Sequence, residues 1–373
     1  MTVAEQTGPG VARAWGWVAH LRTGGTTPWA GWSGDADPTG RVLPGAQQLE
    51  LLRRINLAAD GLVPEELVER VLAASAPGRG RAELELVGAA YDARFGAPPV
   101  DPSDLPAEEV VRVAAHLLAQ DLVALGPLPR PVVRQRPWRR RVMLVGDPWL
   151  RSEVTRQLID AGRAPRPGGR VVVVGADLPR MLADAWTNAC FDRPVGSWDE
   201  WLGNWRNRRG LPPGLQLGQL VEHWREVAGD RNVELVLDER RLSSALRGPQ
   251  VERVRRPGRT AAGLARRVAF SLSLMIPVSE RRTLLRDGLL PRIPDEFFDV
   301  GLPALPPEHE EWVRTRGDRL AEQLREAGYP VRDSQWSGGA QPQAPGTHPA
   351  AGGDRAALDL AVGLLLGGWK AQP

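Results

Sequence analysis

The hydrophobic positions follow a helical period over the first third of the chain and then change to short, continuous apolar runs. Apolar residues at spacings of three and four predict amphipathic helices, and proline followed by acidic residues suits a first helical turn. Helices are predicted over Val11–Thr23, from Gln47, from Pro64, over Leu84–Phe95 and from Asp104. The pattern requires no strand in this region, so we predict an all-helical domain over residues 1–128.

Beyond residue 141 the pattern indicates alternating strands and helices. Three apolar runs predict strands, namely Val142–Val145, Val171–Val174 and Val233–Leu237. The second run is all valine with no polar alternation, which is typical of a strand buried on both faces of a parallel sheet. Helices are predicted to Ala161 and over Pro179–Cys190, Ser197–Trp205 and Gln216–Val227. This order favours a parallel α/β sheet with right-handed crossovers.

Proline and glycine mark the boundaries between the predicted domains. A Pro- and Arg-rich stretch over 129–141 is predicted to be a linker, because prolines favour an extended chain and arginines favour water. The α/β domain then covers 142–335, with residues 251–330 mostly helical. A Gly/Pro/Gln-rich stretch over 336–353 predicts a second linker, and 354–373 predicts a tail helix.

Composition excludes several classes of protein. The chain has 373 residues, of which 42% are hydrophobic, so it can build a core. Cys190 is the only cysteine, which excludes an internal disulfide and a multi-cysteine metal site, and we expect it to be a packed, inert thiol. No apolar run approaches the length of a membrane span and no signal pattern begins the chain, so the expected location is cytoplasmic, away from membranes.

The lysine and arginine content excludes further classes of function. Lys370 is the only lysine among 48 basic residues, so the chain has no Walker A lysine to neutralise a transferring phosphate. The formal charge of +3 is too small to indicate nucleic acid as a partner. No nucleophile elbow or paired-glycine dinucleotide fingerprint occurs, which argues against hydrolase and dehydrogenase functions.

Two stretches of the α/β region resemble the actinobacterial branch of the sulfotransferase family. The first, Val171–Trp186, places Asp177, Leu178, Arg180 and Trp186 after a valine-rich strand, and Leu215–Trp224 and Val233–Leu237 continue the pattern. The second runs from Pro307 to Asp333. The resemblance implies a parallel-sheet, three-layer α/β sandwich related to P-loop kinases. It also implies 3′-phosphoadenosine 5′-phosphosulfate as donor, with Asp177, Arg180 and Trp186 at cofactor-binding positions.

The departures from that family pattern bear on function. Ala176 stands where the family has an arginine for the 3′-phosphate, and Asp184 stands where it has a serine. Exchanging a guanidinium for a methyl and a hydroxyl for an anion makes the pocket repel phosphate. The sequence therefore predicts a catalytically degenerate sulfotransferase-like protein that acts as a binding or partner subunit. The alternative is an active sulfotransferase that moves a sulfo group to a carbohydrate or secondary metabolite, with arginines replacing the lost groups.

Two stretches have the small residues of a phosphate loop. Gly24–Thr27 follows a predicted helix, so we expect a helix C-cap and a loop there. Gly146–Ser152 follows a strand, but Asp147 would repel an anion, so we expect a plain α/β turn with an acidic N-cap.

The remaining candidates have structural explanations. No histidine pair has metal-binding spacing, so the sequence predicts no metal site; His116 is expected in the core and His309 in a solvated first turn. Asp35 and Asp37 are expected in a solvated turn rather than a sugar-nucleotide site. The stripe formed by Trp198, Trp201 and Trp205 is expected to be core rather than a sugar platform.

The predicted linker leaves a third functional class open. Arginines over residues 134–141 surround Trp138, a combination of charge and stacking surface that can follow a polyanion such as a nucleic acid or polysaccharide. The alternative is that Trp138 docks the linker and the arginines are hydrated.

Overall fold

The structure is a computed structural model of the whole chain. It describes residues 9–37, 42–75, 84–89, 97–126, 142–163, 165–166, 168–247, 250–301, 303–331 and 353–368. The chain divides into two compact units, one formed by 1–128, 263–293 and 349–373 and the other by 129–262 and 294–348. The described residues are mostly helical and contain one three-stranded parallel sheet, so the predicted mixed α/β class is confirmed at that level.

The first unit is helical in its described residues. Its elements are α1 (Pro9–Arg22), η2 (Trp29–Gly31), α2 (Ala46–Ala58), α3 (Glu65–Ala73), η3 (Pro102–Asp104), α4 (Ala107–Leu125), most of α10 (Arg259–Met275), α11 (Val278–Thr283), the π-helical turn η6 (Leu284–Leu289), η7 (Leu290–Arg292) and α14 (Gly353–Leu366). The helices predicted from Gln47, Pro64 and Asp104 correspond to α2, α3 and α4.

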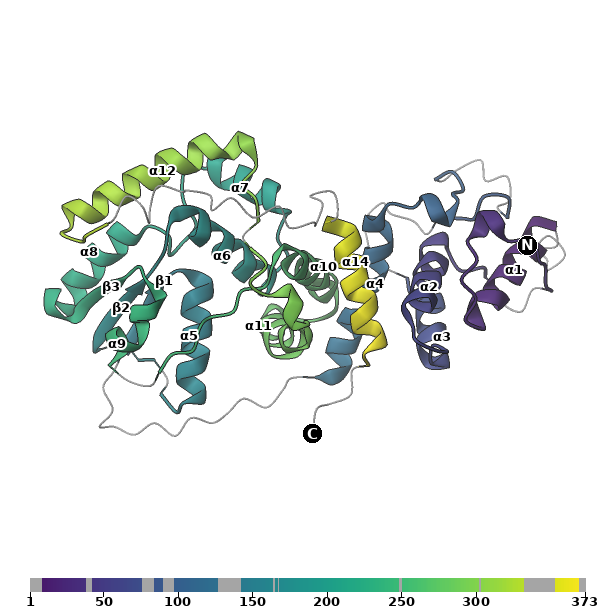
Figure 1. Cartoon of the computed structure of the whole chain (residues 1–373), viewed down its shortest axis with the longest axis horizontal. Coiled ribbons are helices and arrows are strands. Elements are labelled where there is room, and N and C mark those ends of the chain that lie inside the picture. The colour runs from purple at the N-terminus through teal and green to yellow at the C-terminus, as the bar shows by residue number, and fades with distance from the viewer. Residues whose placement is uncertain are drawn as a thin grey trace. The chain divides into compact units, whose positions relative to one another are not determined.

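Helix α4 is the centre of this unit. It buries Val110, Leu117 and Leu122 completely, and it packs against α2, α14 and η6. The tail helix α14 lies along α4 (Figure 1), and an ion pair between Asp354 and Arg267 of α10 fastens its first turn. The C-terminal helix is therefore part of the helical core.

The predicted division of the chain differs from this arrangement in two places. Residues 263–293 were expected in the α/β domain, and 354–373 were expected to form a separate tail. Both segments belong to the helical unit in the structure. Apolar periodicity shows that a helix is buried but does not show which core buries it, which explains the difference. The predicted linker over 129–141 lies outside the described residues, as does the one over 336–353 except for Gly353, which begins α14.

One predicted helix is wrong in its described part. Leu84–Phe95 was expected to be helical, but Leu86 forms an isolated parallel bridge with Val100, followed by a turn. Gln47 in α2 accepts a hydrogen bond from the Leu84 amide at 3.0 Å. These contacts, with the backbone hydrogen bond from Val87 to Val100, take the place of helical hydrogen bonds here. Residues 90–96 lie outside the described part of the chain.

The second unit holds the sheet. Its elements are β1 (Val142–Gly146), α5 (Pro148–Asp160), β2 (Arg170–Val174), α6 (Leu178–Cys190), α7 (Trp198–Asn207), α8 (Leu217–Ala228), η4 (Asp230–Asn232), β3 (Val233–Val236), η5 (Glu239–Arg241), α9 (Leu242–Leu246), η8 (Asp295–Phe297) and α12 (Pro307–Glu326). The three predicted strands and the helices between them are confirmed within one or two residues at each end.

The sheet has the strand order β1-β2-β3, and all strands are parallel. Val142 is paired with Arg170, and Val171 with Val233. The valines of β2 are 0–2% exposed, as expected for a central parallel strand. Helix α8 packs on the sheet, α5 packs on β1 and α6, and α12 lies outside α8 (Figure 1). Among the described residues, no helix combines the length and apolar character needed to cross a bilayer.

The end of β1 depends on a glycine. Gly146 has φ +107°, and a Cβ built there would lie 2.0 Å from the carbonyl oxygen of Val174 on β2. Both the left-handed conformation and the close approach to backbone exclude a side chain. Gly146 therefore sets how β1 leaves the sheet.

We expect Gly146→Ala to lower the free energy of unfolding by about 3 kcal/mol, because strain and a backbone clash add together. Urea denaturation followed by circular dichroism measures the change. Gly61→Ala is the control, since a Cβ there meets nothing within 4 Å. Equal stability of the two variants would contradict this account of the strand end.

Candidate functional site

The carboxyl ends of the three strands form the candidate site. Each strand is followed within three residues by an aspartate that caps the next helix. The side chains accept hydrogen bonds from backbone amides, Asp147 from Leu150 at 2.9 Å, Asp177 from Arg180 at 3.0 Å and Asp238 from Arg240 at 3.0 Å. Ligands of open α/β sheets bind at this edge, where helix N-termini converge.

Two carboxyl groups lie buried beneath this edge. Asp147 is 1% exposed and Asp184, on α6, is 2% exposed. Burial and the neighbouring charge of Asp184 raise the pKa of Asp147 well above its ordinary value. Burial also raises the pKa of Asp184, and the guanidinium of Arg256 opposes that shift. We therefore assign the proton of this coupled pair to Asp147 and the negative charge to Asp184.

Arg256 supplies the countercharge for Asp184. Its Nε lies 3.0 and 2.9 Å from the two carboxylate oxygens of Asp184, and its Nη2 donates to Glu239 at 2.5 Å. Burial lowers the pKa of Arg256, but the charges of Asp184 and Glu239 outweigh that effect and raise it above the ordinary arginine value. A guanidinium shared by two carboxylates in a dry site is held firmly.

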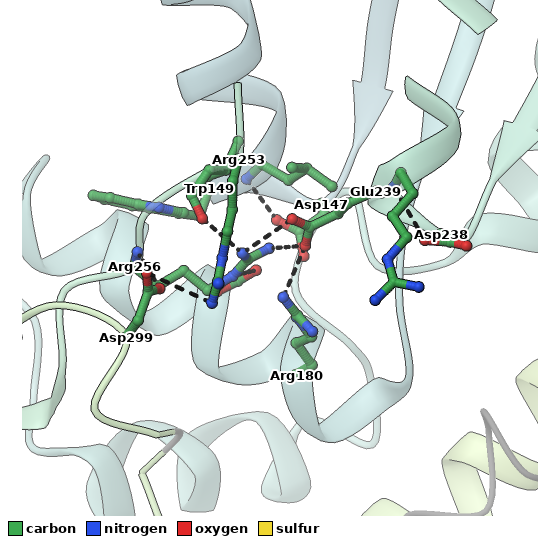
Figure 2. Close-up of polar contacts among 12 residues, drawn as sticks. Asp147, Trp149, Arg180, Asp238, Glu239, Arg253, Arg256 and Asp299 are labelled. Atoms are coloured by element: carbon green, nitrogen blue, oxygen red, sulfur yellow. Dashed lines mark hydrogen bonds and ion pairs between the residues drawn. The ribbon is translucent and has the colours of Figure 1, made fainter. Parts of the chain in front are cut away.

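Glu239 joins a second arginine to the cluster. Its carboxylate also accepts from Nη2 of Arg180 at 2.8 Å, and Figure 2 shows the side chains of Arg180 and Glu239 pointing toward each other. With Asp147 protonated, the two arginines balance the charges of Asp184 and Glu239. These four side chains together thus carry no net positive charge to attract an anion, although Nε of Arg180 is buried without a hydrogen-bond partner.

The segment that carries Arg256 is fastened on both sides. The indole of Trp149, which is fully buried, donates to the carbonyl of Arg255 at 3.0 Å. Asp299 accepts from the amide of Arg256 at 3.1 Å, and its own amide donates back to the Arg256 carbonyl at 2.8 Å (Figure 2). The guanidinium is therefore positioned by the backbone as well as by its ion pairs.

The three residues assigned from the resemblance have these positions in the structure. Asp177 caps α6, and Arg180, one turn later, pairs with Glu239. Trp186 is 2% exposed, and its indole donates to the carbonyl of Gly196 at 3.3 Å. Asp177 and Arg180 lie at the strand-end edge, whereas Trp186 lies in the core. Their cofactor role remains a prediction.

Sequence reasoning missed the central member of the cluster. Asp184 was expected to repel phosphate as a free anion, but it is paired with Arg256, 72 residues later. No sequence motif distinguishes Arg256, because the chain is rich in arginine and Arg256 lies in a loop without a periodic pattern. Asp147 was identified as an acidic N-cap, and that prediction is confirmed. Its burial was not foreseen.

The other candidates can now be placed. Gly24 ends α1 with φ +88°, so the helix C-cap and loop are confirmed there. Asp35 and Asp37 lie in an exposed loop, and Cys190, Trp198 and Trp201 are buried as expected, whereas Trp205, the third member of the predicted stripe, is only half-buried. His116 is buried and contacts Gln120 at 3.2 Å.

The expectation that His309 lies in a solvated first turn was wrong. Its side chain is 4% exposed, and its Nε2 lies 3.0 Å from Asp199. Trp138 and the arginines around it lie outside the described residues.

Comparison with protein-family models, with curated proteins and with solved structures found no match. The geometry of the described residues is therefore the basis for any functional proposal.

The buried pair generates a prediction about pH. The folded state holds the proton of Asp147 more tightly than the unfolded chain does, so its contribution to stability is lost as pH rises from about 4 through the raised pKa. Asn keeps the cap and cannot ionise. We expect Asp147→Asn to match the unmodified chain near pH 4 and to exceed its stability at pH 7 by at least about 1 kcal/mol.

Guanidinium denaturation between pH 4 and 8 measures this difference. Asp238→Asn is the control, because Asp238 caps a helix with a half-exposed carboxylate. Parallel pH profiles for the unmodified chain and Asp147→Asn would show that no buried carboxyl group titrates in this range.

The ion pair generates a second prediction. Asp184→Asn leaves the buried guanidinium of Arg256 with one carboxylate partner, so we expect the free energy of unfolding to fall by about 3 kcal/mol. Replacing both charges, Asp184→Leu with Arg256→Met, should recover part of this loss because no charge stays unpaired between them. Urea titrations at pH 7 compare the variants. An Asp184→Asn variant as stable as the original would contradict the role assigned to this pair.

Proposed function

We propose that this chain is a catalytically degenerate, sulfotransferase-like protein that acts as a binding or partner subunit. Under this proposal the three parallel strands and their helices are the remnant of a three-layer sandwich. The edge that holds the sulfonucleotide in active relatives serves to stabilise the protein in this chain.

The ion pairing of the arginines at the strand ends is the observation that carries the proposal. Arg256 is 12% exposed and is bound by Asp184 and Glu239, and Glu239 also holds Arg180. An anionic donor would have to displace Glu239 from two guanidinium groups. It would then face the buried charge of Asp184, which argues against binding of a sulfonucleotide.

The residues after β2 agree with this view. Ala176, in the place of the family's arginine, offers a methyl group with no charge. Asp177 uses its carboxylate to cap α6. In the turn after β1, a phosphate would bind the free amides at the start of α5. The side chain of Asp147 occupies that position and accepts a hydrogen bond from the Leu150 amide.

An active sulfotransferase with atypical donor-binding residues is the alternative. Two arginines do converge at the strand ends, as that hypothesis expects. One of them keeps a spare donor, because Nε of Arg180 is buried without a hydrogen-bond partner. In this view Glu239, which is 25% exposed, moves aside when the donor binds.

Calorimetry with 3′-phosphoadenosine 5′-phosphate distinguishes the two functions. The degenerate protein should show no saturable binding at ligand concentrations up to about 1 mM, since Arg180 and Arg256 at the strand ends are bound to internal carboxylates. The alternative predicts micromolar binding that Arg180→Gln weakens at least tenfold. Arg240→Gln, which removes an exposed arginine beside the site, is the matched control. Micromolar binding lost only in Arg180→Gln would overturn the degenerate assignment.

A further inference from the structure

The first turns of α7 and α12 bring three metal-binding side chains together, outside the strand-end site. Asp199 comes from α7, and Glu308 and His309 come from α12. One ligand atom of each lies within 4.8 Å of the ligand atoms of the other two. Nε2 of His309 is 3.0 Å from Oδ1 of Asp199, although the two residues are 110 positions apart in sequence.

The donor types favour one class of metal ion. An imidazole nitrogen with two carboxylates suits zinc, whereas calcium and magnesium prefer oxygen ligands alone. Ligands of a tetrahedral zinc ion lie roughly 3 to 3.5 Å from one another. The ligand atoms lie within 4.8 Å of one another, and the long side chain of Glu308 is exposed, so packing does not prevent it from turning toward that spacing.

Hydrogen bonds between the two segments hold these residues in place. The indole of Trp198, the first residue of α7, donates to the carbonyl of Ala304 at 3.0 Å. Arg206 of α7 donates to the carbonyl of Glu308 at 2.8 Å. A site fastened by its backbone binds a metal without first ordering its ligands.

The burial of His309 is the second observation. The imidazole is 4% exposed, aims Nε2 at Asp199, and leaves Nδ1 buried without a hydrogen-bond partner. A buried histidine whose partner is an exposed carboxylate is incompletely satisfied within the protein. When Nε2 binds a metal, the ring proton moves to Nδ1, which finds no acceptor, so the affinity should be micromolar rather than nanomolar.

The two carboxylates attract a cation, against opposing positive charge of similar size. Two carboxylates contribute two negative charges, and the two helix N-termini offset roughly half a charge each. The guanidinium of Arg206 opposes a cation from the exposed side, where solvent screens it.

We propose that Asp199, Glu308 and His309 form a zinc site that joins α7 to α12 and leaves a coordination position open to solvent. The site does not depend on the proposed sulfotransferase ancestry. A position open to water can accept an anionic or carbonyl oxygen of a ligand, so the class of ligand is a small oxygen donor.

Titration of the full, chelator-stripped chain with zinc chloride at pH 7.5 tests the site. We expect one ion bound with a micromolar dissociation constant and a rise of about 3 °C in the thermal midpoint at saturation. Cobalt chloride serves as a spectroscopic probe, and its visible bands report nitrogen and oxygen ligation.

Variants show whether these residues bind the ion. Asp199→Asn, at a largely exposed position that leaves the core intact, should weaken binding at least tenfold, and His309→Gln should abolish it. His223→Gln and Asp318→Asn are matched controls on exposed positions of α8 and α12. Binding that does not saturate, or that is unchanged in Asp199→Asn or weakened equally by the controls, would overturn the assignment.

Discussion

The buried contact between Asp184 and Arg256 is the constraint on which the α/β unit depends. A carboxylate beneath the ends of parallel strands can stay ionised only with a cation beside it, because the interior solvates charge poorly. Arg256 meets that need from a loop that returns to the sheet long after β2. Its position fixes Glu239, and Glu239 fixes Arg180. One buried charge therefore organises the end of every strand.

This constraint bears on function as well as on stability. Ligand-binding edges of α/β sheets need donors or cations that are free before the ligand arrives. In this chain the arginines at that edge are bound to internal carboxylates, and the helix amide at Leu150 is bound to Asp147. The arginines and helix amides that an anion would need are the groups that stabilise the fold. In this structure they are bound to carboxylates of the protein itself.

Local patterns predicted the helices and strands well, because the hydrophobic period of each element can be recognised from a few consecutive residues. The all-valine run of β2 and the apolar stripe of α4 are examples. The failures arose where a partner distant in sequence decides the outcome. Leu86 bridges Val100 instead of continuing a helix, His309 is buried although acidic residues surround it, and Asp184 meets Arg256 across 72 residues. Composition excluded several classes of site, but it did not reveal which arginine forms an ion pair with Asp184.

Comparison of the two charged clusters indicates where a ligand would bind. At the strand ends, carboxylates and guanidinium groups cancel within a dry site, so an incoming ion gains little and must break existing bonds. At the start of α7 and α12, the carboxylates of Asp199 and Glu308 remain exposed to solvent, while the histidine beside them is buried. Binding energy is available where ligand atoms are already positioned and an incoming ion has no buried ion pair to break. By that criterion we expect an ion to bind at Asp199, Glu308 and His309 rather than at the carboxyl ends of the strands.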